Sequence, residues 1–196
     1  MRTRDVEKEE LVKHKAMELV VKDGLEGFSV NKLAKACGIS VATLYIYYKD
    51  KDDLITAIAI EESKIMTSSS LKDFDPEMSF ADGLKLQWKN RYKYMMEHPY
   101  SIPFFEQLRT STYEEKVFAN MNVEFKKTMG KFMDNALKRG EINKMPLEVY
   151  WSIAFSPLYS LAKFHQNGKS IGGHPFTISN KIVWQTFDLV LKALTP

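Results

Sequence analysis

The sequence has few of the features that mark disulfide-bonded, membrane-spanning or metal-binding proteins. Cys37 is its only cysteine, which excludes a disulfide framework within one chain and favours a reducing compartment. Its longest charge-free apolar stretch, 149–162, is interrupted by Pro157 and is shorter than the roughly 20 residues that span a bilayer. The four histidines are scattered, without an HExxH motif, and the N-terminal residues lack the apolar segment of a signal peptide. We therefore expect a cytoplasmic protein with no membrane partner, no metal site and no cofactor.

A strong excess of one charge sign is also missing. The chain carries 28 basic and 25 acidic side chains, a net charge of +3. Residues 1–51 hold 10 basic and 8 acidic side chains, so most of this small excess lies at the N-terminal end. The sequence has no glycine-rich phosphate loop, no GxSxG motif and no acid–base pair or nucleophile constellation. It therefore predicts no catalytic residues, and the protein is not expected to be an enzyme.

Helical periodicity is present along almost the whole chain. Apolar residues recur three to four positions apart, which predicts an all-α fold of about nine helices without a convincing strand. Gly24 is expected to end the first helix, and one long helix is predicted from about Phe118 to Ala136. Two more long helices are predicted over 147–165, with a kink at Pro157, and over 177–194. The Ser-, Asp- and Pro-rich segment 67–77 is expected to join an N-terminal head to a larger body.

Residues 29–48 predict two short amphipathic helices joined by a tight turn. Ser29 and Ser40 are good N-caps, and Gly38 can adopt the backbone conformation that turns one helix sharply across the other. The pair is expected to be held together by five apolar or aromatic side chains, with the Cys37 thiol as an inert core residue: Leu33, Cys37, Ile39, Leu44 and Tyr48. Such a unit is a helix-turn-helix.

The other side of the second helix has the residue types of a helix that reads a DNA major groove. Ala42 is small, while Val41 and the methyl group of Thr43 can contact thymine methyl groups. The hydroxyls of Thr43, Tyr45 and Tyr47 can reach phosphates or base edges. Ser29 begins a helix at a position suited to a phosphate, and Lys51 is expected to bind the DNA backbone.

The same segment resembles the DNA-binding sequence of the TetR family over about a quarter of the chain. The resemblance rests on the run Phe28-Ser29-Val30-x-Lys32-Leu33-Ala34-x-x-Cys37-Gly38-Ile39-Ser40-x-Ala42-Thr43-Leu44-Tyr45-x-Tyr47-Tyr48-Lys49-x-Lys51-x-x-Leu54. It implies that Thr43, Tyr45, Tyr47 and Lys51 hold phosphates, that Val41 and Ala42 face bases, and that Asn31 and Lys32 add contacts. Val41 stands where the family often has a smaller residue, so the base preference does not carry over.

The resemblance also implies a division of labour along the chain. Residues 1–50 would form the DNA-binding head, residues about 51–70 a connecting helix, and residues 71–196 a body that binds a small, largely apolar effector and dimerises. Bulky apolar residues of the body are the candidates for the effector pocket: Trp88, Tyr92, Met95, Phe105, Phe118, Met121, Phe125 and Tyr159. The two last long helices can form a four-helix bundle across a two-fold axis through Trp151, Phe155, Trp184 and Phe187.

The function expected from these features is that of a ligand-responsive transcriptional regulator. A homodimer would bind a near-palindromic operator in double-stranded DNA, and repression is the default output, although the sequence does not give its sign. Two other classes stay open. One is a helical lipid- or drug-binding protein whose head no longer binds DNA, and the other is a small helical enzyme whose active site lies in the apolar body.

Overall fold

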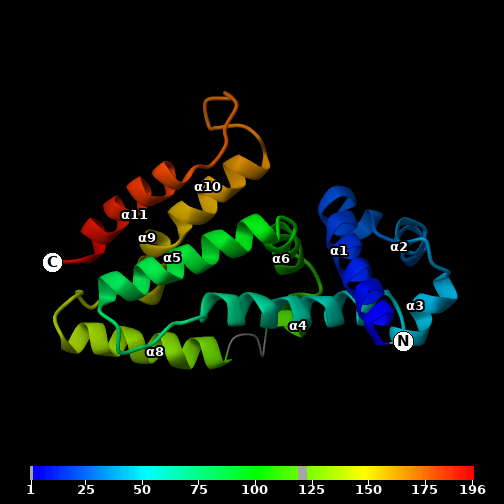
Figure 1. Cartoon of the computed structure of the whole chain (residues 1–196), viewed down its shortest axis with the longest axis horizontal. Helices are drawn as coiled ribbons and strands as arrows, with labels where there is room; N and C mark the ends of the chain where they lie inside the picture. Colours follow the sequence, from blue (N-terminus) through cyan, green and yellow to red (C-terminus); the bar gives the residue numbers. More distant parts are fainter. Residues whose placement is uncertain (1, 119–122) are drawn as a thin grey trace. The chain divides into compact units, whose positions relative to one another are not determined.

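The computed structural model describes residues 2–118 and 123–196, and over these residues it is built from helices (Figure 1). The described helices are α1 Arg2–Gly27, α2 Val30–Cys37, α3 Val41–Tyr47, α4 Lys51–Ser70, α5 Phe80–Glu97, α6 Ser101–Arg109, α7 Glu114–Phe118, α8 Val123–Lys138, α9 Leu147–Ala154, α10 Ser156–Gln166 and α11 Asn180–Leu194. The all-α prediction is confirmed, with eleven described helices instead of about nine. None of the described helices combines the length and apolarity that a membrane crossing requires.

The helices pack as two compact units. Unit 1 comprises Met1–Ile65 and His98–Met121, and therefore contains α1–α3, most of α4, α6 and α7. Unit 2 comprises Met66–Glu97 and Asn122–Pro196, and contains the last residues of α4 together with α5 and α8–α11. α4 thus contributes residues to both units.

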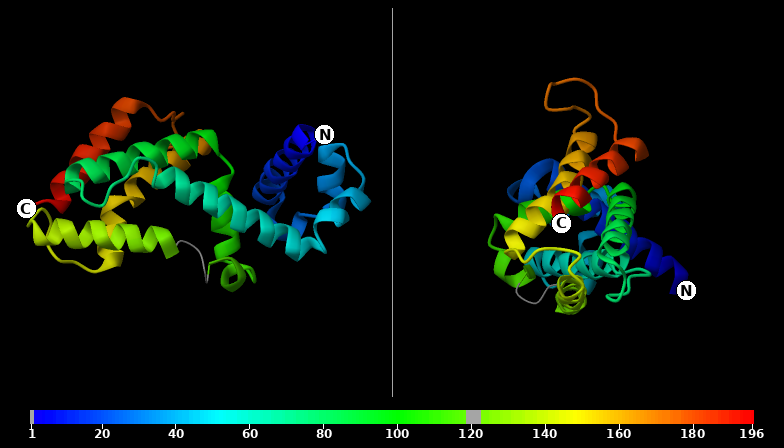
Figure 2. Two further views of the ribbon diagram at one scale, coloured as in Figure 1. Left: turned by 60° about the horizontal axis from the view of Figure 1, so that its bottom comes forward. Right: turned by 90° about the vertical axis from the view of Figure 1, so that its left-hand side faces the viewer.

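Unit 1 is built around α1, which packs against α2 and α6. Val20 of α1, Leu33 of α2 and Phe104 of α6 are buried in its core. In Figure 2 (left), α1, α2 and α3 lie beside one another in shades of blue. Gly24 interrupts α1 with a φ of 75°, and one further turn follows to Gly27. The predicted helix stop at Gly24 is therefore a kink, because glycine adopts this backbone conformation without a steric penalty.

Unit 2 is held together by α5, which contacts α8, α10 and α11. The indole N–H of Trp88 on α5 donates to the carbonyl of Ala154 at 2.7 Å, and its ring packs edge-on against Phe187 of α11. On the same helix, Gly83 faces the ring of Phe132 from α8 so closely that a Cβ would lie 2.4 Å from Cε2.

Two amide side chains of α5 bind carbonyls at the C-terminal end of α4. Gln87 donates from Nε2 to the carbonyl of Ser70 at 2.7 Å. Asn90 donates from Nδ2 to the same carbonyl at 3.3 Å and to that of Lys72 at 2.8 Å. These bonds satisfy carbonyls that have no partner within the helix. α4 extends to Ser70, so the loop that follows begins later than the predicted joining segment 67–77.

One of the predicted long helices is divided. The helix expected over 147–165 is broken into α9 and α10 at Phe155, whose φ and ψ are −127° and −31°. Pro157 lies in the first turn of α10, where its missing N–H costs no hydrogen bond. In the stretch expected to be one helix from Phe118, Phe118 ends α7 and α8 begins at Val123, while 119–122 lie outside the described residues.

Candidate nucleic-acid interface

The turn between α2 and α3 is fixed by local hydrogen bonds. The side chain of Ser29 accepts a bond from the backbone N–H of Lys32 at 3.2 Å, and that of Ser40 accepts one from Thr43 at 3.1 Å. Between these caps Gly38 adopts the left-handed conformation, with a φ of 64°, and ends α2. The predicted N-caps and the predicted glycine turn are confirmed, because each depends on residues within a few positions of one another.

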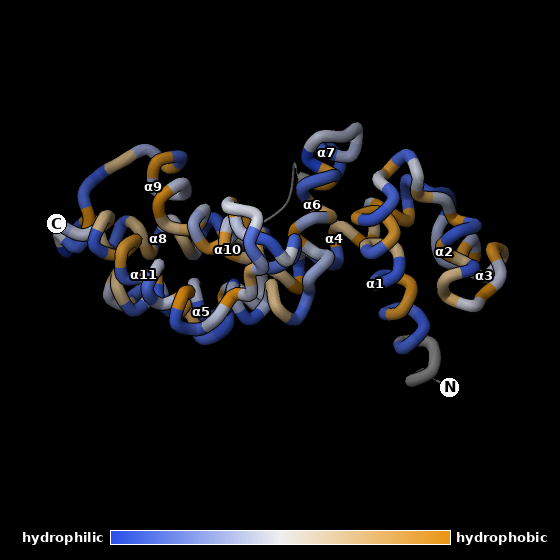
Figure 3. The backbone as a smooth tube through the Cα atoms, turned by 90° about the horizontal axis from the view of Figure 1, so that it is seen from above, coloured by the Kyte–Doolittle hydropathy of each residue, from blue (hydrophilic) through white to orange (hydrophobic). Residues whose placement is uncertain are grey.

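α3 buries one apolar side chain and exposes a hydrophobic outer face. Leu44 is 2% exposed, whereas Tyr47 is 67% and Ile46 is 76% exposed. Tyr45 and Ala42 are also exposed, and Val41 and Thr43 are half-buried. In Figure 3 much of α3 is drawn in the colour of hydrophobic residues. The exposed Ile46, which lies between the two exposed tyrosines in the sequence, was not among the residues predicted to contact DNA.

Both lysines predicted to contact DNA hold the end of α1. Lys32 donates from Nζ to Asp23 at 2.7 Å and to the carbonyl of Gly27 at 2.8 Å. Lys51 donates to the carbonyls of Leu25 at 2.7 Å and Phe28 at 3.1 Å. These bonds satisfy carbonyl groups at the helix terminus. The ammonium groups thus connect α2 and α4 to α1. The sequence did not reveal this role, because periodicity does not show on which group a lysine side chain ends.

The remaining residues predicted for the head lie at or near its surface. Asn31 is exposed and Ser29 is half-buried, while the Thr43 hydroxyl lies 2.9 Å from that of Ser40. Cys37 is half-buried and not part of the inner core, and burial raises the pKa of its thiol. Burial likewise raises the pKa of the Tyr48 phenol. The head therefore presents neutral hydroxyl, amide and apolar groups around α3.

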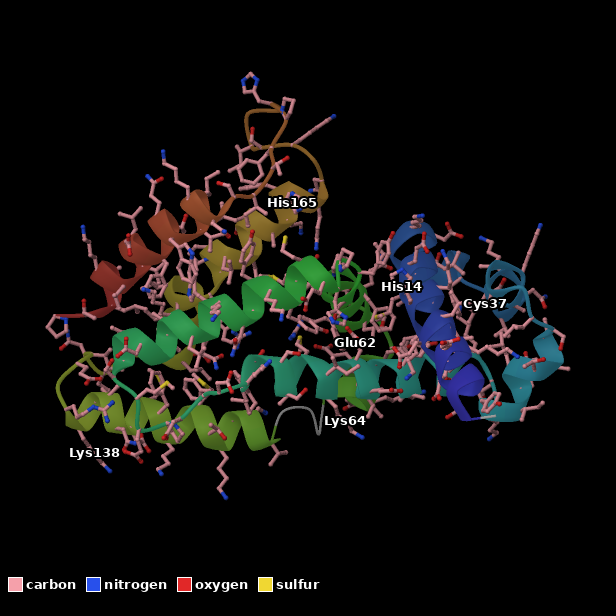
Figure 4. All side chains as sticks on the ribbon, viewed as in Figure 1. His14, Cys37, Glu62, Lys64, Lys138 and His165 are labelled. Atoms are coloured by element: carbon pink, nitrogen blue, oxygen red, sulfur yellow. The ribbon has the colours of Figure 1, made fainter. Side chains whose placement is uncertain are left out.

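Metal-binding residue types do not converge anywhere in residues 2–118 and 123–196: no group of three or more could hold an ion. Figure 4 places His14 on α1 and His165 on α10, which belong to different units.

The residues predicted for an effector pocket do not all belong to one unit. Trp88 and Met95 are buried in unit 2, where Tyr92, Phe125 and Tyr159 are half-buried. Phe105 is buried in unit 1. The side chain of Phe118 and all of Met121 lie outside the described residues.

The four residues predicted for a dimer interface divide between surface and interior. Trp151 is exposed and Trp184 is half-buried, whereas Phe155 and Phe187 are buried within their own chain. The same helices expose three aliphatic side chains that the sequence reading did not single out: Leu147, Val149 and Leu189. An apolar surface along α9 and α11 therefore exists, but only part of it comes from the predicted residues.

The fold of unit 1 and its capped, sharply turned helix pair define a helix-turn-helix protein. Residues 14–58 match the family described as bacterial regulatory proteins, tetR family. An HTH-type transcriptional regulator from Haemophilus influenzae is 32% identical over 81 residues, which cover 41% of this chain and 43% of that protein. The matched segment thus spans less than half of this relative's length.

Similarity to solved structures extends over the entire chain. A TetR family transcription regulator from Marinobacter aquaeolei is 26% identical, with a TM-score of 0.84, and the match covers 100% of this chain and 99% of that one. A TetR-family regulator from Haemophilus influenzae has the same fold, with a TM-score of 0.77 at 20% identity over 98% and 99% of the two chains. Residues 14–58 thus match the tetR family of bacterial regulatory proteins, and the whole chain is similar in sequence and fold to TetR family transcription regulators.

Proposed function

We propose that the protein binds an operator through α3 and regulates transcription as a ligand-responsive homodimer, by default as a repressor. The observation that carries the proposal is the sidedness of α3, which buries Leu44 and exposes Tyr45, Ile46 and Tyr47. A short helix that lies at the surface of the packed head, fixed there by two caps and a glycine turn, has the geometry that enters a major groove.

Base reading in this proposal is done mainly by apolar contact. Ala42 allows close approach, and Val41 and Ile46 offer surfaces for thymine methyl groups. The hydroxyls of Thr43, Tyr45 and Tyr47, together with Ser29 and Asn31 of the preceding turn and helix, are placed to bind phosphates. Lys32 and Lys51 add positive charge near the DNA backbone while their ammonium groups remain hydrogen-bonded to carbonyls of α1.

Two heads are needed to reach useful affinity, since each α3 covers only a few base pairs. We assign the dimer contact to α9 and α11, whose exposed Leu147, Trp151 and Leu189 form apolar surface. The operator would then be nearly palindromic, with half-site centres about 34–36 Å apart or a multiple of that distance. Such a protein acts in the cytoplasm, where the DNA is.

Ligand response would act through α4, the connecting helix within residues about 51–70, which links a DNA-binding head (1–50) to a body (71–196) that takes up an effector. An effector that binds better to one arrangement of the heads shifts the population toward it. If that arrangement does not fit the operator, DNA is released. Because a bound dimer blocks polymerase, repression is the output proposed.

The test measures binding of the full chain to its own upstream DNA by fluorescence anisotropy over a range of salt concentrations. Tyr47→Ala is expected to weaken binding with little change in the salt dependence, because a neutral hydroxyl displaces no counterion, and Tyr47→Phe, which lacks only the hydroxyl, is expected to weaken binding less. Ile46→Ala is expected to weaken binding as well, whereas Ile171→Ala, at a loop residue that is 88% exposed, is the matched control.

Lys51→Ala is less direct because it also removes two bonds to α1, so its melting temperature must be measured alongside. If Tyr47→Ala and Ile46→Ala both bind DNA with wild-type affinity, the assignment of α3 as the DNA-contacting helix is wrong. A chain that binds no DNA at all would instead support a ligand-binding protein that has lost this activity.

A further inference from the structure

A positively charged side chain lies buried in unit 2, and none of the acidic side chains that the structure describes pairs with it. Arg91 of α5 is 6% exposed. Its Nη1 donates to the hydroxyl of Tyr159 at 2.7 Å, but its buried Nε has no hydrogen-bond partner. Among the ion pairs of the described residues, none involves Arg91. Burying a charge without an opposite charge is costly, so this arrangement indicates that something is missing from the site.

Aromatic rings surround the guanidinium. Its central carbon lies 4.4 Å from the ring centroid of Phe155, 5.3 Å from that of Phe125 and 5.4 Å from that of Trp151. The rings stabilise the cation through their negative faces, but they cannot accept an N–H in the plane of the guanidinium. The N–H of Nε therefore still lacks an acceptor. A planar carboxylate, which arginine binds through two parallel hydrogen bonds, is a group that would supply one.

Two more polar atoms near this helix face are buried and unpaired. The Oε1 of Gln87, one helical turn before Arg91, has no partner because the amide donates through Nε2 to Ser70. The hydroxyl of Tyr150 is also unpaired, and its ring packs edge-on against Phe155, with centroids 6.0 Å apart. Native proteins leave few such groups unsatisfied, and a ligand is one recognised reason for them.

We propose that the effector carries a carboxylate, which Arg91 binds, joined to an apolar part that contacts the rings of Phe125, Trp151 and Phe155. A single arginine matches a single negative charge, and apolar walls disfavour a more highly charged group such as a phosphate. Trp151 is 39% exposed, so one wall of the cluster reaches the α9 surface that is assigned above to the dimer contact. The inference deepens the proposed function by naming the chemical class of the effector.

The experiment compares hexanoate, decanoate and phenylacetate with the matched amides by thermal shift and calorimetric titration of the full chain. The carboxylates are expected to raise the melting temperature, because they bind only the folded state, and the amides to raise it far less. Arg91→Met is expected to weaken carboxylate binding by at least about tenfold, since it removes charge-assisted hydrogen bonds. Lys89→Met, an exposed cation of the same helix, is the control and is expected to bind like the wild type.

If Arg91→Met does not fold, Tyr159→Phe replaces it: the loss of its hydroxyl removes the bond that fixes the orientation of the guanidinium, and it is expected to weaken carboxylate binding several-fold. The inference is overturned if no carboxylate binds, if amides bind equally well, or if the substituted chain binds carboxylates unchanged. DNA binding is measured separately without any carboxylate. If the chain binds carboxylates selectively but does not bind DNA, only the proposed function is overturned. If it binds DNA but does not bind carboxylates selectively, only this inference is overturned.

Discussion

Gly83 is a position where one hydrogen atom in place of a methyl group decides how two helices pack. Gly83→Ala would bring a Cβ within 2.4 Å of the Phe132 ring, which is itself fully buried and cannot move away freely. We expect the free energy of unfolding to fall by about 1–3 kcal/mol, the usual range for overpacking. Gly130→Ala, on exposed α8 backbone with nothing within 4 Å of the new methyl group, is expected to raise it by about 0.5–1 kcal/mol. Urea denaturation of both variants is the measurement, and equal effects would contradict the packing described.

Glu18 of α1 gives a pH-dependent contribution at the same scale. Hydrogen bonds from Lys15 at 2.7 Å and Lys22 at 2.6 Å lower the pKa of its carboxyl to about 2. A lowered folded-state pKa stabilises the protein above the unfolded value of about 4.5, and this stability is lost as the pH falls toward 2. Glu18→Gln is therefore expected to lower the free energy of unfolding at neutral pH, by no more than about 1 kcal/mol because solvent screens the pair.

The difference between Glu18→Gln and the wild type should narrow as denaturation is repeated at successively lower pH. Glu26→Gln, at an exposed position of the same helix, serves as the comparison. A gap of constant size between pH 7 and pH 3 would count against the ion pairs.

At the scale of the element, Ser40 is the residue on which α3 depends most. The helix has seven residues, too few to be stable alone, so the bond from the Thr43 N–H to Ser40 Oγ matters. Ser40→Ala is expected to cost about 1 kcal/mol of stability and to weaken DNA binding. Ser179→Ala removes the corresponding cap of α11 and should cost similar stability while leaving DNA binding unchanged. Melting curves and anisotropy titrations of both variants distinguish the two effects, and equal losses of DNA affinity would refute the special role of Ser40.

The elements that the sequence predicted well are those with local causes. The caps at Ser29 and Ser40, the turn at Gly38 and the break near Pro157 all follow from backbone chemistry within a few residues. What it did not predict depends on contacts distant in the chain. Lys51 reaches back 26 residues to Leu25, and periodicity cannot show whether an ammonium ends on a carbonyl or in solvent.

Burial explains the other differences. Phe155 and Phe187 were assigned to a dimer contact from apolar patterning alone, yet patterning does not tell an inner face from an outer one when both are apolar. Arg91 was not singled out at all, because a lone arginine in a helical sequence is ordinarily a surface residue. Only its contacts with side chains of α8, α9 and α10 reveal its burial.

At the scale of the whole molecule, the proposed dimer contact lies on the apolar surface of α9 and α11. Leu189→Glu places a charge on exposed apolar surface of α11, and two copies would meet at a two-fold contact. We expect the variant to sediment as a monomer and to lose most of its operator affinity, while keeping its helical content. Ile171→Glu changes an equally exposed aliphatic residue outside these helices and should remain dimeric. Analytical ultracentrifugation reads out both, and a dimeric Leu189→Glu would move the contact elsewhere.

The three hydrogen bonds that join α5 to the carbonyls of Ser70 and Lys72 limit how these helices can move. Gln87 is wholly buried, so its amide group cannot replace a lost carbonyl with water. If α5 is displaced, the final turn of α4 either moves with it or the buried amide of Gln87 loses its hydrogen bond. The first outcome costs less free energy. In the proposed effector response, a displacement of α5 at Arg91 would therefore be passed to the last turn of α4 through these bonds.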